Sequence, residues 1–231
     1  MQYLKCIIFD MDGTLTQTNQ LIYDSFNYIA ERYIHKRFTP PEITAFFGPP
    51  EKEAIENMIG SDHIDEAMKE YYRFYEERHN ELAALYPGMK DTLQFLKTEG
   101  LRVGLFTGKG RRTTEITLKK FGIAPYFDMV VTGDDVKEFK PSSEGIRKIM
   151  KHFALASDEV LMVGDAVADV KASHDAGVKI AAVLWDSYAK EKVLQMKTDF
   201  VFHDVAEFQS WLMSLLNPPK NDGVFNRSAQ S

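Results

Sequence analysis

The sequence has only one cysteine, Cys6, among its 231 residues, so no disulfide bond can form within the chain. It has no apolar run long enough to cross a membrane, and its opening residues, with Lys5 in the first apolar stretch, are not those of a secretion signal. An excess of basic residues is also missing, since the net charge is −6. We therefore expect a soluble cytoplasmic protein that binds neither nucleic acid nor membranes.

The first feature that the sequence does contain is an apolar run that ends in two acids, within residues 4–16 (LKCIIFDMDGTLT). This pattern predicts a buried parallel strand that opens into a loop, and ligands bind at such strand ends. Asp10 and Asp12 can share chemistry there: one attacks, and the other moves protons or faces a metal. A calcium loop is excluded because Gly13 follows Asp12 directly and Leu21 occupies the twelfth position. A plain strand-to-turn boundary is the alternative.

Beyond residue 88 the sequence alternates between short apolar runs and helical periodicity. Strands are expected at 103–106, 129–131, 160–163, 180–183 and 200–202, and helices at 89–99, 113–121, 142–153, 167–175 and 205–216. This alternation predicts the α/β class, with a doubly wound, Rossmann-like parallel sheet. Residues 217–231 have little apolar content and are expected to form a flexible tail.

Residues 18–85 show helical patterns and no convincing strand, with a long helix expected at about 62–85. We predict that they form an all-helical cap, inserted after the first strand of an α/β core made of residues 1–17 and 86–216. A lid that excludes water is favoured at the strand ends. The alternative is that these helices only thicken the core.

The second predicted strand runs into a glycine-rich turn that contains Thr107 and Gly108. A hydroxyl and neighbouring backbone N–H groups at a helix start suit an anion, although a plain turn explains the glycines equally well. Lys109, Arg111 and Arg112 lie near the same helix start. They could face a substrate anion, but solvated surface charge is the better interpretation of the two arginines.

Two later stretches carry further charged groups. Lys140 is held just before a proline, where it could neutralise both a nucleophilic aspartate and a phosphate. Asp165 and Asp169 follow a buried strand four positions apart, so they face the same way. Together with Asp10 and Asp12 they would repel one another unless a cation neutralises them, and a small set of oxygen ligands suits Mg²⁺. Stabilisation of a helix start is the alternative for Asp169.

These four stretches resemble, in order, the four motifs of the haloacid dehalogenase-like superfamily. The first is Asp-x-Asp-Gly-Thr at 10–14, the second is Thr107, the third is Lys140 followed by proline, and the fourth is the acid pair at 165 and 169. One departure is that the third motif lacks a second proline, which leaves the following turn less predictable. The resemblance covers nearly the whole chain except the tail.

The resemblance implies a Mg²⁺-dependent phosphatase that works through an aspartyl-phosphate. The implied catalytic residues are Asp10 as nucleophile, Asp12 as acid and base, Thr107 and Lys140. The implied phosphate-binding residues are Asp10, Thr107, Gly108 and Lys140. The implied Mg²⁺ ligands are Asp10, Asp12 through its carbonyl oxygen and Asp165, with Asp169 in close support.

Residues 18–22 and 47–50 look like those of the phosphoglycolate phosphatase and bacillus-type pyrophosphatase group. We therefore expect a small phosphorylated substrate and a monomer or homodimer. An inorganic pyrophosphatase and a sugar phosphomutase of the same superfamily are alternatives. A receiver-type signalling domain is a more remote alternative, because a receiver needs no helical insertion and no acid at Asp12. Intact motifs argue against a catalytically silent binding protein.

Overall fold

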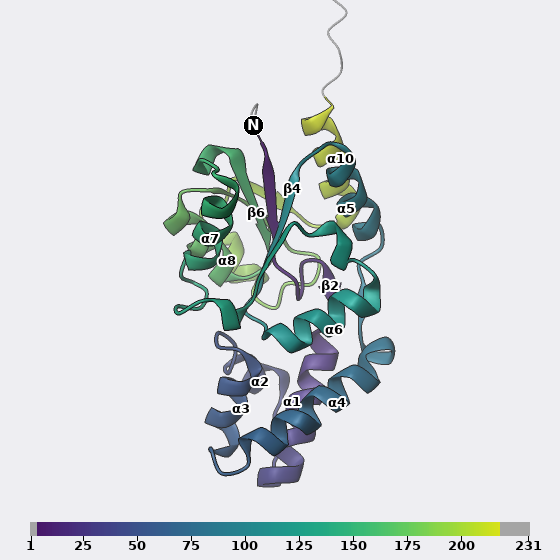
Figure 1. The fold of residues 1–231 in the computed structure, drawn as a ribbon, viewed down its shortest axis with the longest axis vertical. Helices are drawn as coiled ribbons and strands as arrows, with labels where there is room; N and C mark the ends of the chain where they lie inside the picture. Colours follow the sequence, from purple (N-terminus) through teal and green to yellow (C-terminus); the bar gives the residue numbers. More distant parts are fainter. Residues whose placement is uncertain (1–3, 218–231) are drawn as a thin grey trace, which may run out of the picture.

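The computed structural model describes residues 4–217 and shows an α/β lobe joined to a bundle of helices (Figure 1). The sheet of the α/β lobe is six-stranded and parallel, in the order β5-β4-β1-β6-β7-β8. Its strands are β1 (Cys6–Phe9), β4 (Arg102–Phe106), β5 (Met129–Val131), β6 (Val160–Gly164), β7 (Lys179–Val183) and β8 (Phe200–Phe202). All four residues of β1 are buried, as expected for a central parallel strand.

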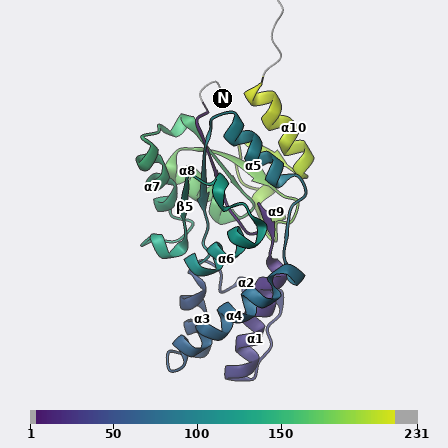
Figure 2. The same cartoon turned by 45° about the vertical axis from the view of Figure 1, so that its right-hand side comes forward.

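Helices cover both faces of this sheet (Figures 1 and 2). One face packs on α5 (Met89–Thr98), α6 (Arg111–Phe121) and α10 (Val205–Leu216), and the other packs on α7 (Glu144–Phe153), α8 (Val167–Ala176) and α9 (Lys190–Leu194). Successive β1 residues alternate between the two cores: Ile7 and Phe9 join the first, and Cys6 and Ile8 join the second. Three 3₁₀ turns, η1 (Ala124–Tyr126), η2 (Gly133–Asp135) and η3 (Ser157–Glu159), complete the lobe. The predicted doubly wound α/β fold is confirmed.

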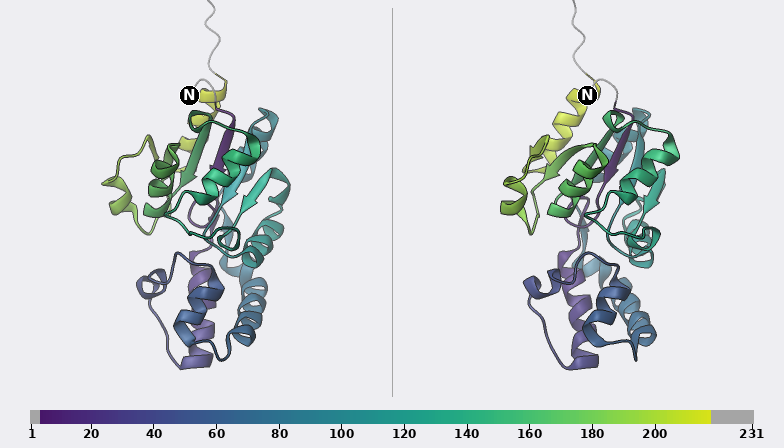
Figure 3. Two further views of the ribbon diagram at one scale, coloured as in Figure 1. Left: turned by 60° about the vertical axis from the view of Figure 1, so that its left-hand side comes forward. Right: turned by 90° about the vertical axis from the view of Figure 1, so that its left-hand side faces the viewer.

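The remaining helices form a separate bundle beyond the carboxyl end of the sheet, and we call this bundle the helical unit (Figures 1 and 3). Its members are α1 (Asn19–Ile34), α2 (Pro40–Thr44), α3 (Glu51–Ile59) and α4 (Ile64–Leu82). They share a core of their own, in which Phe26, Tyr71 and Tyr75 are buried. Ile116 of α6 belongs to the same cluster, so the helical unit rests on α6.

The two chain segments that join the lobes correct one sequence prediction. A helix reaching residue 85, with no strand before it, was expected, but α4 ends at Leu82 and Ala83 is extended. Strand β3 (Ala84–Leu85) then pairs antiparallel with β2 (Thr16–Gln17). Two-residue strands are too short to show a periodic pattern, so the prediction was wrong there. Their pairing ties together the chain segments that enter and leave the helical unit.

Among residues 4–217, no helix is both long enough and apolar enough to span a membrane. The predicted flexible tail, residues 217–231, lies outside the described residues apart from Asn217, which follows α10.

Candidate active site

The strand ends of β1, β4 and β6 open into a cavity of about 400 Å³ that the helical unit also lines. Asp10 follows β1, Thr107 follows β4, and Asp165 follows β6. These strands are neighbours in a parallel sheet, so their carboxyl ends meet at one edge. All seven residues predicted for the site line this one cavity: Asp10, Asp12, Thr107, Gly108, Lys140, Asp165 and Asp169.

Three carboxylates and one lysine form the floor of the cavity. Lys140 Nζ donates to Asp10 Oδ1 at 2.8 Å and to Asp169 Oδ1 at 2.7 Å. Oxygens of Asp10, Asp165 and Asp169 all lie within 4.8 Å of one another. Burial raises the pKa of Asp10 to about 7, against the opposing charge of Lys140 and with added repulsion from Asp169. Burial, followed by repulsion from Asp10 and Asp169, raises the pKa of Asp165 as well.

This donor set fits Mg²⁺. Each of the three carboxylates offers a hard oxygen, all three are buried, and one ammonium group cannot balance their combined charge. A buried negative charge without a partner is costly, so a bound divalent cation would relieve the repulsion.

Mg²⁺ should therefore stabilise the fold more at high pH than at low pH. The folded-state pKa values of Asp10 and Asp165 lie above the ordinary value of about 4, so the metal-free protein retains protons that Mg²⁺ must displace as the pH falls. At a hundredfold excess over its dissociation constant, Mg²⁺ contributes about 2.7 kcal/mol. That corresponds to a rise in Tm of roughly 5–10 °C at pH 8 and much less at pH 5. Thermal melts at constant ionic strength test this, and equal shifts at the two pH values would contradict it.

The loop after β1 folds back against Asp165. Gly13 adopts a φ of +79°, and a Cβ atom there would lie 2.6 Å from Asp165 Oδ2, so this position needs glycine. Thr14 Oγ1 donates to Asp165 Oδ1 at 3.2 Å. The Asp-Gly-Thr sequence thus brings the end of β1 against the end of β6.

Asp12 is held over the same cavity from two sides. Thr18 Oγ1 donates to Asp12 Oδ1 at 2.5 Å, and Lys109 Nζ lies 3.3 Å from both Asp12 oxygens. Thr107 is buried, and its Oγ1 accepts the Lys109 N–H at 3.2 Å. The loop with the predicted phosphate-binding threonine therefore also supplies a cation to Asp12.

Two residues of this arrangement were not predicted as site residues from the sequence. The role of Lys109 was left open, and the structure places its ammonium group against Asp12, buried, while Arg111 is exposed and pairs with Asp135. Glu51, the first residue of α3, is buried beside Lys109. The sequence shows Glu51 only as an acid in the first turn of a helix, an ordinary position that does not indicate a contact with the other lobe.

The fold and the cavity define an α/β protein whose acidic groups gather at adjacent ends of parallel strands. Residues 7–183 match the family model for haloacid dehalogenase-like hydrolases, and the chain belongs to this family. The predicted family and the prediction of a hydrolase are thereby confirmed. The alternative of a receiver-type signalling domain is dropped.

Two relatives agree with this assignment, and two solved structures share the fold. Pyrophosphatase PpaX of Anoxybacillus flavithermus is 34% identical over 209 residues, which cover 90% of this chain and 97% of the relative. Pyrophosphatase PpaX of Bacillus velezensis is 35% identical over 204 residues, covering 88% and 94%. A predicted phosphoglycolate phosphatase of Haemophilus somnus has a similar fold, with a TM-score of 0.79 at 23% identity, covering 92% of this chain and 99% of that structure. A hydrolase of Pseudomonas syringae gives 0.77 at 21% identity, with coverage of 91% and 99%.

Proposed function

We propose that this hydrolase is a Mg²⁺-dependent phosphatase that cleaves a small phosphorylated molecule through an aspartyl-phosphate on Asp10. The observation that carries the proposal is the placement of Asp10 at the floor of the cavity, paired with Lys140, while Asp12 reaches the same cavity. One carboxylate is thus available to attack, and a second one is available to move protons.

In this proposal the Asp10 carboxylate attacks phosphorus, and the bond between phosphorus and the leaving oxygen breaks. Asp12 gives its proton to that oxygen, and it then takes a proton from the water that attacks the aspartyl-phosphate. This second attack releases inorganic phosphate and restores the Asp10 carboxylate. Lys140 balances the charge on Asp10, and Thr107 and the Gly108 N–H bind the phosphoryl oxygens.

Mg²⁺ would be held by Asp10, the carbonyl oxygen of Asp12 and Asp165, with Asp169 in close support. When bound, it would supply positive charge to the phosphoryl oxygens. Asp169 also makes two hydrogen bonds within the α/β lobe. Its Oδ1 accepts a hydrogen bond from Lys140 Nζ, and its Oδ2 accepts one from the Ala166 N–H at 3.0 Å. Asp169 thus orients the lysine that faces the nucleophile.

We also propose that residues 18–85 act as a cap that selects the substrate. The helical unit supplies one wall of the cavity, and the phosphoryl chemistry lies in the α/β lobe, with residues 1–17 and 86–216 as its proposed extent. The wall is mostly apolar, formed by Ile22, Phe26, Phe46, Phe47, Pro49 and Ala54. Such a wall favours an organic leaving group, because apolar contacts contribute little to the binding of an anion.

Inorganic pyrophosphate is the second candidate substrate. It is favoured by the relatives named pyrophosphatase, which match this chain over nearly their full length. Three lysines, Lys109, Lys140 and Lys171, line the cavity from the α/β lobe and could balance a second phosphate group.

Purified protein with Mg²⁺ should release phosphate from at least one member of a panel of phosphoglycolate, pyrophosphate, a hexose phosphate and 4-nitrophenyl phosphate. EDTA should stop the reaction, and added Mg²⁺ should restore it, because the phosphoryl charge is then neutralised again. The ratio of kcat/KM for the best organic phosphate of the panel to that for pyrophosphate decides between an organic phosphate and pyrophosphate as the substrate. A protein with the expected thermal stability that releases phosphate from none of these compounds, or that works fully in EDTA, would contradict the proposal.

A further inference from the structure

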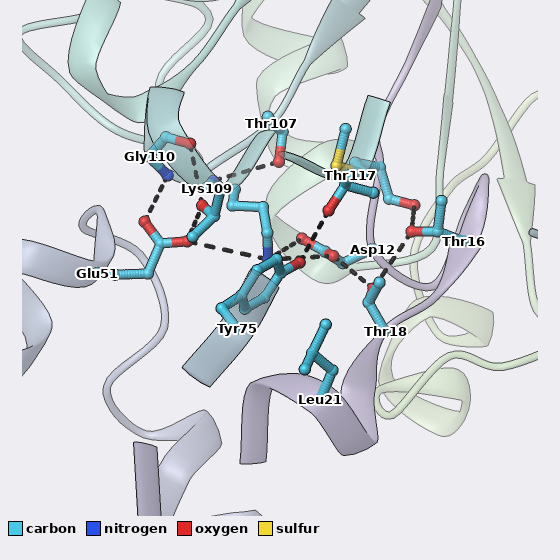
Figure 4. Close-up of polar contacts among 12 residues, drawn as sticks. Asp12, Thr16, Thr18, Leu21, Glu51, Tyr75, Thr107, Lys109, Gly110 and Thr117 are labelled. Carbon is cyan, nitrogen blue, oxygen red and sulfur yellow. Dashed lines mark hydrogen bonds and ion pairs between the residues drawn. The ribbon is translucent and has the colours of Figure 1, made fainter. Parts of the chain in front are cut away.

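Glu51 is a buried carboxylate that the helical unit inserts into the α/β lobe (Figure 4). Its Oε2 accepts the Gly110 N–H at 2.7 Å, and its Oε1 accepts the Thr113 hydroxyl at 2.5 Å. Gly110 is the N-cap of α6, and Thr113 is in its first turn, where backbone N–H groups lack helical partners and the helix dipole favours negative charge. Glu51 therefore fastens the helical unit to the start of α6.

Gly110 makes room for this contact, because a Cβ atom there would collide with the Glu51 carboxylate. The loop that Glu51 fastens is the one that carries Thr107, whose hydroxyl accepts the Lys109 N–H. A contact made by the helical unit thus reaches the loop that lines the proposed phosphoryl site.

Lys109 lies between Glu51 and Asp12, as Figure 4 shows. Its Nζ is 3.3 Å from both Asp12 oxygens, 3.9 Å from Glu51 Oε1 and 4.9 Å from the centre of the Tyr75 ring. The Lys109 side chain is only 3% exposed, so the position of its ammonium group is determined by these neighbours rather than by water. Glu51 and Tyr75 both belong to the helical unit, on α3 and α4.

On its other side, Asp12 Oδ1 accepts a hydrogen bond from the hydroxyl of Thr18, the residue just before α1, at 2.5 Å. The Thr18 hydroxyl also contacts that of Thr16, with the two oxygens 3.2 Å apart. Each group that holds the Asp12 carboxylate is thus next to the helical unit: Thr18 directly precedes α1, and Lys109 contacts Glu51 and Tyr75.

We propose that Glu51 is a positioning residue, which acts through Lys109 to hold Asp12 in the orientation that proton transfer needs while the helical unit is docked on α6. The inference rests on the proposed function, because it takes Asp12 to be the acid and base of a phosphatase. The contact between the helical unit and α6 then does more than line the cavity: it also aligns the proton donor. Without the Glu51 charge, Lys109 keeps only one carboxylate neighbour and can draw Asp12 out of place.

Glu51→Gln tests this with little change of shape. The amide oxygen can still accept the Gly110 N–H, and the amide nitrogen can donate to the Thr113 hydroxyl oxygen, so docking is retained while the charge that faces Lys109 is lost. Glu53→Gln is the matched control, since Glu53 is exposed in the same first turn of α3. Thermal melts of both variants establish that they fold.

The readout is kcat/KM for phenyl phosphate and for 4-nitrophenyl phosphate, which are similar in shape but differ in how much the leaving oxygen needs a proton. Misplacement of a catalytic group by about 1 Å can cost on the order of a hundredfold. For Glu51→Gln we expect a loss of about tenfold to a hundredfold with phenyl phosphate and less than about threefold with 4-nitrophenyl phosphate. Glu53→Gln should match the native protein with both compounds.

Equal losses with the two compounds would mean that Glu51 only docks the helical unit, and no loss with either would mean that Lys109 holds Asp12 without it. Either result overturns the inference. Asp12→Ala, measured in the same experiment, distinguishes a failure of this inference from a failure of the proposed role of Asp12. If Asp12→Ala shows the dependence on the leaving group and Glu51→Gln does not, the inference fails alone. If Asp12→Ala does not show it, the proposed role of Asp12 fails first.

Discussion

Replacing Asp10 by Asn should abolish turnover and leave the fold intact. The amide is a very poor nucleophile, so no aspartyl-phosphate can form, and losses on the order of 10⁴- to 10⁶-fold are typical when a nucleophile is removed. The fold should survive because Asn has the same shape and removes one of three buried carboxylates that repel one another. Lys140 keeps Asp169 as a partner at 2.7 Å. The measurement is steady-state phosphate release, combined with thermal melts without Mg²⁺.

Asp91→Asn is the control for this substitution, because Asp91 is exposed on α5 outside the cavity. It should retain the native rate. A folded Asp10→Asn protein that kept even one part in a hundred of the native rate, after contaminating phosphatases had been excluded, would show that Asp10 is not the attacking group.

Replacing Asp12 by Ala should give the second large effect, and its size should depend on the leaving group. General acid catalysis contributes roughly a hundredfold to ten-thousandfold, so phenyl phosphate should react slower by about that factor. With 4-nitrophenyl phosphate the first step should be nearly unchanged, since 4-nitrophenolate leaves without a proton. The second step should be slow with both compounds, because Asp12 is also the base that activates water.

Pre-steady-state kinetics separate the two steps. Asp12→Ala should release a burst of 4-nitrophenolate equal to the enzyme concentration, followed by slow turnover. Hydrolysis of phenyl phosphate at the native rate would reduce Asp12 to a structural acid of the loop, held by Thr18 and Lys109.

The groups at the strand ends could be predicted because their signals are local. Asp10, Thr107 and Asp165 each follow an apolar run, and parallel strands bring such ends to one edge of the sheet. The sequence analysis did not predict the order of the strands. In the structure β4 and β6 are the two neighbours of β1, so the three strand ends lie side by side. Lys140 and Asp169 were placed by short motifs that precede or open a helix.

The contacts of Lys109 and Glu51 could not be predicted, because each depends on a partner far away in the sequence. Lys109 meets Asp12 at a separation of 97 residues, and Glu51 meets Gly110 at a separation of 59. A lysine at a helix start is ordinarily exposed, but this one is enclosed by Asp12 of the α/β lobe and by Glu51 and Tyr75 of the helical unit. The short helix α9 was missed for a different reason, since its five residues, KEKVL, are mostly charged and show no periodic pattern.

The most direct test of the account is to find the phosphoryl group on Asp10. Asp12→Ala should be mixed with 4-nitrophenyl phosphate and Mg²⁺, quenched in acid during the burst, digested and analysed by tandem mass spectrometry. The account predicts the mass of one phosphate on the peptide that contains Asp10, localised to that residue and absent from an Asp10→Asn/Asp12→Ala double variant. Phosphate on another residue, or a burst of 4-nitrophenolate with no phosphate on this peptide, would contradict it.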